Sequence, residues 1–117
     1  MQEKLKARTK RFAVDVFRFC EELPDDPQCW VIEKQLMRSA SSVGANYRAA
    51  CRAQSRAAFV AKMAIVEEEA DESLFWLEMV EELDHAPPSA LSPLKEEATE
   101  LLAIAASSKK SARENGG

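Results

Sequence analysis

The residues best suited to chemistry are cations that recur along one segment of the chain: Lys34, Arg38, Arg48 and Arg52. A helix advances about 100° per residue, so all four fall within about 40° of one line along its surface. Ser41 and Ala45 lie between them, and such small side chains let a phosphate backbone or another helix approach closely. Arg56 follows at the start of the next helix. The pattern predicts phosphate-directed, weakly sequence-specific binding of RNA or DNA.

A second interpretation keeps the same cations engaged within the protein. The acidic run from Glu67 to Glu72 could pair with them, which would leave a protein–protein interaction scaffold with no nucleic-acid role. The charge distribution fits both interpretations. Residues 1–62 hold 12 Lys and Arg against 7 Asp and Glu, whereas residues 63–117 hold 4 against 13, within a net charge of −4.

The chain offers little for catalysis. His85 is the single histidine, and its place at an expected helix C-terminus favours a charge that complements the helix dipole. There is no nucleophile elbow, no P-loop and no dinucleotide fingerprint. The acidic run lacks the Glu-x-x-His motif of di-metal bundles. We therefore predict that the protein is not an enzyme and that it binds no metal and no cofactor.

The cysteines indicate a compartment rather than a reaction. Cys20, Cys29 and Cys51 are odd in number and lack a Cys-x-x-Cys spacing, so we expect small buried apolar residues in a reducing cytosol. No signal-peptide apolar region follows the charged N-terminus, and no uncharged run approaches the ~20 residues that span a bilayer. These features predict a cytoplasmic protein with no membrane partner.

Helix-breaking residues divide the chain into four amphipathic segments. The breaks fall at residues 23–27, at 54–55 and at 85–88. Asp26 and Ser55 are the expected N-caps of the second and third helices, and Ser89 or Ser92 that of the fourth. We predict one all-α domain over residues 1–117, an antiparallel up-down-up-down four-helix bundle, with a polar, frayed tail at about 107–117.

The third helix carries apolar residues on two opposite faces. One face forms a heptad-like seam for the core: Phe59, Met63, Val66, Ala70, Leu77 and Val80. The other includes two aromatic residues and is predicted to be an oligomer interface: Ile65, Phe75, Trp76, Met79 and Leu83. The alternative is that the second and fourth helices cover the third helix on both sides.

The segment from Leu36 to Ala50, LMRSASSVGANYRAA, together with Phe59, Glu68, Glu69, Leu74 and Glu78, resembles a known family. It is the four-helix-bundle family of proteins encoded in 23S rRNA intervening sequences and of Avd-like accessory proteins of diversity-generating retroelements. The resemblance implies a homopentamer, and for Avd-like members nucleic-acid binding and a reverse-transcriptase partner. Arg38, Ser39, Ser42 and Asn46 match the family's motif, and from the last three we expect packing or helix–helix hydrogen bonds.

Overall fold

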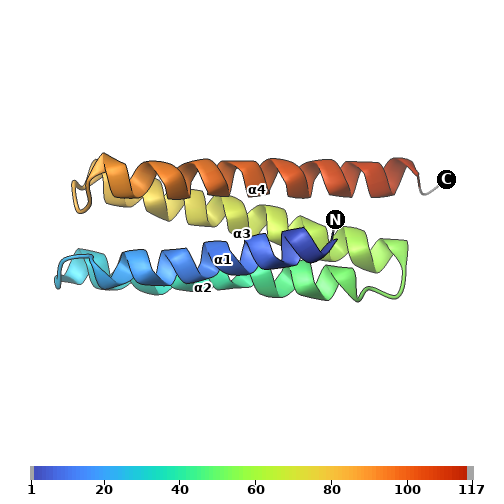
Figure 1. Ribbon diagram of the computed structural model, residues 1–117, viewed down its shortest axis with the longest axis horizontal. Coiled ribbons are helices and arrows are strands. Elements are labelled where there is room, and N and C mark those ends of the chain that lie inside the picture. Colours follow the sequence, from blue (N-terminus) through green and yellow to red (C-terminus); the bar gives the residue numbers. More distant parts are fainter. Residues whose placement is uncertain (1, 116–117) are drawn as a thin grey trace.

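The computed structural model describes residues 2–115, which form four helices and no strand. The helices are α1 (Gln2–Glu21), α2 (Pro27–Cys51), α3 (Arg56–Glu82) and α4 (Pro88–Glu114). Each runs antiparallel to the one before it, so the predicted all-α, up-down-up-down bundle is confirmed (Figure 1). The bundle measures 50 × 22 × 19 Å, with the helices along its long axis.

Two of the expected helix starts are confirmed. The Asp26 side chain accepts a hydrogen bond from the backbone N–H of Cys29 at 2.9 Å, and Pro27 occupies the first turn of α2. The Ser55 hydroxyl accepts from Ala58 N–H at 3.1 Å and caps α3. Both caps satisfy backbone donors that a helix leaves unpaired in its first turn.

The expected start of α4 at a serine cap is wrong. Pro87 occupies the N-cap position with no side-chain hydrogen bond, and the helix begins at Pro88. Proline suits this place because its φ is already helical and it has no N–H to leave unsatisfied. Ser89 and Ser92 therefore lie inside the first turns of the helix.

α4 also continues well past the predicted start of the frayed tail at residue 107. Ala105 is buried, and the Lys109 ammonium lies 2.7 Å from a Glu67 carboxylate oxygen on α3. This pairing anchors the last turns of α4 against α3, and the helix ends only at Glu114. The final two glycines of the predicted tail lie outside the described residues.

The core follows the predicted apolar faces. α2 contributes five large or small apolar side chains from one face, and all are buried: Ile32, Leu36, Val43, Tyr47 and Ala50. In the α3 seam only Phe59 remains partly exposed. A buried polar pair also crosses this core, because the hydroxyls of Ser39 on α2 and Ser73 on α3 lie 2.8 Å apart. The expected helix–helix hydrogen bond is thus confirmed for Ser39.

Ser42 and Asn46, from which packing or helix–helix hydrogen bonds are expected, are half-buried, and the amide of Asn46 donates to the hydroxyl and carbonyl of Ser42 within α2. These hydrogen bonds reach back one helical turn.

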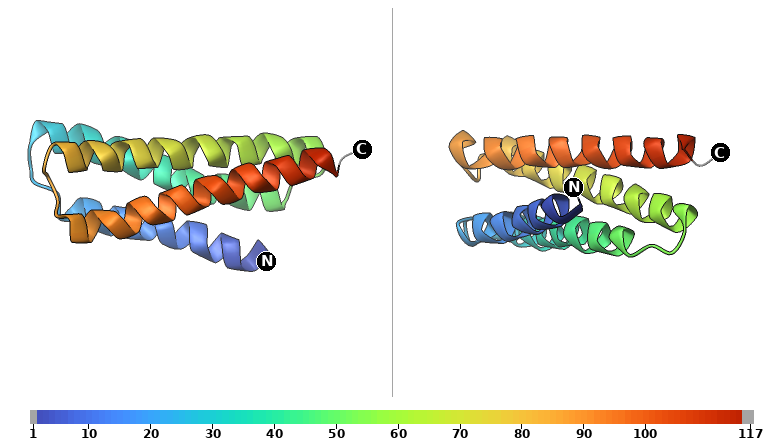
Figure 2. Two further views of the ribbon diagram at one scale, coloured as in Figure 1. Left: turned by 90° about the horizontal axis from the view of Figure 1, so that it is seen from above. Right: turned by 45° about the vertical axis from the view of Figure 1, so that its right-hand side comes forward.

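The helices do not approach one another equally. α1 lies close to α2 at Gly44, where an added Cβ would sit 3.4 Å from the carbonyl oxygen of Thr9. α1 and α4, by contrast, diverge toward the end of the bundle that holds both termini (Figure 2). No helix in residues 2–115 is long and apolar enough to cross a membrane.

Candidate nucleic-acid interface

The charges of this bundle separate along its long axis. One end holds the α2–α3 turn, the start of α1 and the end of α4 (Figure 1). We call it the basic end, because its cations outnumber its acids Glu3 and Glu114; those cations are Lys4, Lys6, Arg48, Arg52, Arg56, Lys110 and Arg113. The opposite end holds the α1–α2 and α3–α4 loops and is the acidic end, with Glu21, Glu22, Asp25, Asp26, Glu82 and Asp84.

Arg48 and Arg52 form the exposed part of the predicted cationic stripe at the basic end. Both side chains are exposed, and neither makes an ion pair with any residue in the described range 2–115. Arg48 lies in the last turn of α2 and Arg52 is its C-cap residue, about 6 Å further along the helix axis. Arg56 follows across the turn and lines a shallow hollow together with Arg113 of α4. Two segments far apart in the sequence thus contribute cations to one surface.

Arg38 is engaged differently, because it holds α2 against α3. Its guanidinium donates to Glu69 at 3.0 Å and also to Glu72. These hydrogen bonds raise the pKa of Arg38 and lower the pKa of the Glu72 carboxyl. The pairing with the acidic run therefore exists within one protomer for this arginine.

Lys34 lies far from the other free cations of the stripe. It is exposed and unpaired among the described residues, but 14 positions separate it from Arg48 on α2, which is about 21 Å along the helix. Lys10 of α1 lies closer to Arg48 than Lys34 does. Its Cα would lie 3.6 Å from a Cβ on Gly44, which is one helical turn before Arg48. The sequence pattern missed Lys10, because only the close approach of α1 at Gly44 brings it beside α2.

The second apolar face of α3 is partly covered by the protomer itself. Trp76 and Met79 pack against the core, and the Trp76 indole N–H donates to Glu72 at 3.2 Å. Phe75, however, is 50% exposed and stacks edge-on against Trp76. Leu83 is exposed on the same helix, and Val31 of α2 is 58% exposed.

The predicted interface residues differ in exposure, and other exposed apolar side chains lie outside the predicted interface. Ile65 is half-buried, so the predicted interface residues share one helix but differ in accessibility. Outside the prediction, three more large apolar side chains are exposed on α1 and α2, namely Val14, Phe17 and Trp30. The Trp30 indole N–H donates to Asp25 at 2.6 Å.

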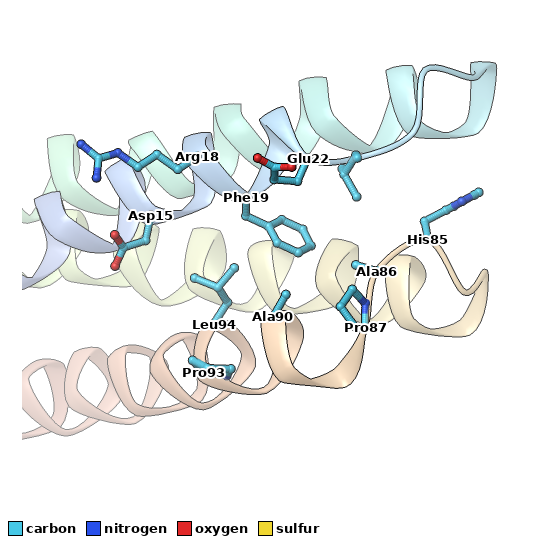
Figure 3. Close-up of a pocket in the computed structure, with 11 residues that line it drawn as sticks. Asp15, Arg18, Phe19, Glu22, His85, Ala86, Pro87, Ala90, Pro93 and Leu94 are labelled. Atoms are coloured by element: carbon cyan, nitrogen blue, oxygen red, sulfur yellow. The ribbon is translucent and has the colours of Figure 1, made fainter.

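At the acidic end, a cleft of about 490 Å³ opens between α1 and the start of α4. Phe19, Leu94 and Pro87 line it, with Arg18 and Asp15 at one side (Figure 3). His85 comes from the α3–α4 loop, and its ring points away from the other labelled side chains (Figure 3). Burial raises the pKa of the Cys20 thiol to about 12 and that of Cys29 to about 11, which keeps both thiols protonated.

Fold and surfaces together define a small helical-bundle protein with a cationic end and an apolar helix face exposed to solvent. Comparison with known families is more specific. The 23S rRNA-intervening sequence protein family matches residues 2–107, and the chain belongs to this family.

The structural comparison agrees with this assignment. The chain is similar to a crystal structure of a protein of unknown function from the S23 ribosomal protein family of Bacteroides thetaiotaomicron, with 32% sequence identity and a TM-score of 0.85. The similarity covers 94% of this chain and 99% of that one. None of the functionally curated proteins matches the chain.

Proposed function

We propose that this protein is a non-enzymatic, homo-oligomeric bundle that binds the phosphates of RNA or DNA through its basic end. The observation that carries the proposal is the state of Arg48 and Arg52, which are exposed and make no ion pair among residues 2–115. Other arginines, such as Arg8 and Arg38, are held by carboxylates of neighbouring helices. A cation with no internal partner can neutralise a phosphate and release its counterions.

Arg38 leaves the proposed binding set, and the basic end takes its place. Binding a phosphate there would require breaking contacts with two carboxylates of α3. Arg48, Arg52 and Arg56 remain as the centre of the proposed surface, and Lys34 lies at its far margin. The described residues show no aromatic platform between these arginines, so the proposed contacts are directed to the backbone rather than to bases.

Self-assembly supplies the affinity that one protomer lacks. Three arginines give only a few phosphate contacts, but a ring repeats them around its axis, and the salt-sensitive free energies of the contacts add. The exposed apolar residues Phe75, Leu83 and Val31 support such an assembly. Full burial of a side chain of this size contributes about 1.5–3 kcal/mol, and Phe75, which is 50% exposed, would contribute about half of that. A homopentamer is the assembly that the family resemblance suggests.

Salt-dependent binding of labelled generic RNA and DNA, with the particle mass followed by light scattering, tests the proposal. We expect a single discrete oligomer whose affinity falls steeply between low and moderate salt. Replacing Arg48 and Arg52 with alanine should lower the slope of log K against log salt by about 1.4–1.8 per bound protomer. The oligomer mass should stay unchanged, because neither residue belongs to the proposed apolar contact.

Arg38→Ala is the matched control, because it removes one equal charge from the same helix. We expect it to leave the salt slope of binding unchanged while lowering stability. If Arg38→Ala and Arg48→Ala reduce binding equally, net charge alone drives the association and the basic end has no special role.

The second candidate function is a protein-interaction scaffold, and the Arg38 pairing with α3 favours it. Under this alternative, charge reversal at Arg48 and Arg52 should break the assembly, since those arginines would meet acids of a neighbouring subunit. A discrete oligomer that ignores nucleic acid even at low salt would also support the scaffold. Phe75→Ser tests the apolar contact separately from the charge pairs, because it should dissociate the oligomer under either function.

A further inference from the structure

Three metal-ligating side chains, from the start of α2 and from the α3–α4 loop, meet at the acidic end. Asp26 caps α2, Cys29 lies in its first turn, and His85 comes from the α3–α4 loop. One ligand atom from each lies within 4.8 Å of the others. Asp26 Oδ2 and His85 Nδ1 lie 4.0 Å apart.

These separations are near those of a tetrahedral zinc site. Zinc binds sulfur at about 2.3 Å, nitrogen at about 2.0–2.1 Å and oxygen at about 2.0–2.2 Å, so its ligand atoms stand about 3.3–3.6 Å apart. Closing the carboxylate–imidazole pair from 4.0 Å needs a movement of less than about 1 Å. We propose that Asp26, Cys29 and His85 bind Zn²⁺, with the fourth position open to water.

The hydrogen bonds around the group leave the required atoms available. The imidazole Nε2 of His85 lies 2.8 Å from the carboxamide Oε1 of Gln28. An Nε2–H that donates to this oxygen leaves the lone pair on Nδ1, the nitrogen that faces Asp26. An outer hydrogen bond of this kind commonly orients a zinc-bound histidine.

The two oxygens of Asp26 have different tasks. Oδ1 accepts from the Cys29 backbone N–H at 2.9 Å and caps the helix, while Oδ2 is directed toward His85. The Asp26 side chain is 36% exposed and that of His85 15%, whereas Cys29 is fully buried. An ion can therefore enter from solvent and reach the sulfur from the outer side of the group.

The donor set selects the kind of ion. One sulfur, one nitrogen and one carboxylate oxygen suit Zn²⁺ and exclude Mg²⁺ and Ca²⁺, which require oxygen ligands. The surrounding charge favours a cation as well, because Asp25 and Asp84 lie in the same two loops and Glu82 is the last residue of α3. The bound ion would join the α1–α2 loop to the α3–α4 loop, which share no backbone hydrogen bond among the described residues.

Zinc titration of metal-free protein in competition with a chromophoric indicator tests the site, with Co²⁺ as the spectroscopic probe. We expect one ion per protomer, a tetrahedral Co²⁺ spectrum with a thiolate charge-transfer band, and a higher melting temperature with Zn²⁺. Gln28→Ala removes the outer hydrogen bond to His85 and should lower the Zn²⁺ affinity by about 10–100-fold. Cys29→Ser and His85→Gln each remove a ligand and should lower it further. Asp26→Asn should also weaken binding, and it keeps the helix cap because asparagine caps as well as aspartate.

Cys51→Ser is the matched control, since Cys51 is the more accessible thiol and lies at the other end of α2. It should bind Zn²⁺ as the unmodified protein does. A charge-transfer band that persists in Cys29→Ser and disappears in Cys51→Ser would overturn the proposal. So would equal affinity in Asp26→Asn, or a Zn²⁺ stoichiometry below one ion per protomer, because the three side chains would then form a hydrogen-bonded cap only.

Discussion

Gly44 allows a sharp test of how closely α1 and α2 pack. It lies within α2, where glycine is about 0.8–1.0 kcal/mol less favourable than alanine. A Cβ at this position would lie 3.4 Å from the carbonyl oxygen of Thr9 and 3.6 Å from the Cα of Lys10. These distances correspond to van der Waals contact with backbone that cannot easily move. One methyl group therefore fits, and a longer side chain does not.

The two effects can be compared in magnitude. Gly44→Ala should gain most of the difference in helix propensity between glycine and alanine, and its shortest contact should cost roughly a few tenths of a kcal/mol. The net increase in the free energy of unfolding is about 0.5–1 kcal/mol. Gly44→Leu must displace α1, and overpacking of this kind costs about 1–3 kcal/mol. For a chain of this length the alanine variant should melt a few degrees higher, by about 2–5 °C.

Urea unfolding monitored by helical circular dichroism measures these changes at one fixed protomer concentration, because assembly makes stability concentration-dependent. Ala45→Gly is the matched control: it lies next to Gly44, its side chain is exposed, and it reports propensity alone. The control should cost about 0.8–1.0 kcal/mol. If Gly44→Ala instead destabilises the protein by more than about 1 kcal/mol, α1 approaches α2 more closely than described and the reasoning fails.

Substitutions at three other contacts test the packing between and within helices. A double-mutant cycle of Ser39→Ala and Ser73→Ala should give a coupling of about 0.5–1.5 kcal/mol, measured by urea unfolding, because each hydroxyl also has a backbone acceptor when its partner is removed. Ser55→Ala removes the α3 cap and should cost about 1 kcal/mol, with Ser55→Gly much closer to the original. Arg38→Ala should cost about 0.5–1 kcal/mol at neutral pH, since the pair is partly exposed. Arg38 lowers the pKa of Glu72, so the stability it supplies is fully present above the ordinary carboxyl pKa and is lost as the pH falls through the lower folded value. The difference between Arg38→Ala and the unmodified protein should therefore shrink progressively in unfolding curves recorded at decreasing acidic pH.

Apolar periodicity predicted the bundle because each helix must bury one face, and the breaks at 23–27, 54–55 and 85–88 left only short connections. The end of α4 was not predictable in the same way. Its final turns are polar, and their order depends on Lys109 reaching Glu67 of another helix. That contact follows from the relative position of α3 and α4, which local propensity does not encode.

The candidate site shows the same limit at the level of a few degrees of helix rotation. Within the predicted stripe, Arg38 and Arg48 stand about 40° to either side of its central line, so about 80° of helix rotation separates them. Arg38 lies on the side toward α3 and meets Glu69, while Arg48 lies on the side away from α3 and meets no carboxylate among the described residues. The angular position of a residue on one helix predicts whether its side chain faces the core or the solvent. It does not predict which charged side chains of a neighbouring helix lie within reach. Asp26 and His85 illustrate the larger limit, since 59 positions separate them and only the fold joins their loops.

The charge asymmetry between sequence halves has a different meaning once the chain is folded. Each half of the sequence spans the length of the bundle, so the asymmetry between halves lies between the α1–α2 pair and the α3–α4 pair. The separation of charge between the two ends is a second asymmetry, which arises because antiparallel helices bring the end of α2 and the start of α3 together (Figure 1). A ring built around an axis parallel to the helices would gather basic ends on one face and acidic ends on the other. Like charges repel on both faces, and bound counter-charge relieves that repulsion. The proposed nucleic acid at the basic end and the proposed zinc at the acidic end would therefore both strengthen assembly. Because the coupling between ligand binding and assembly is reciprocal, each ligand should bind the ring more tightly than the single protomer.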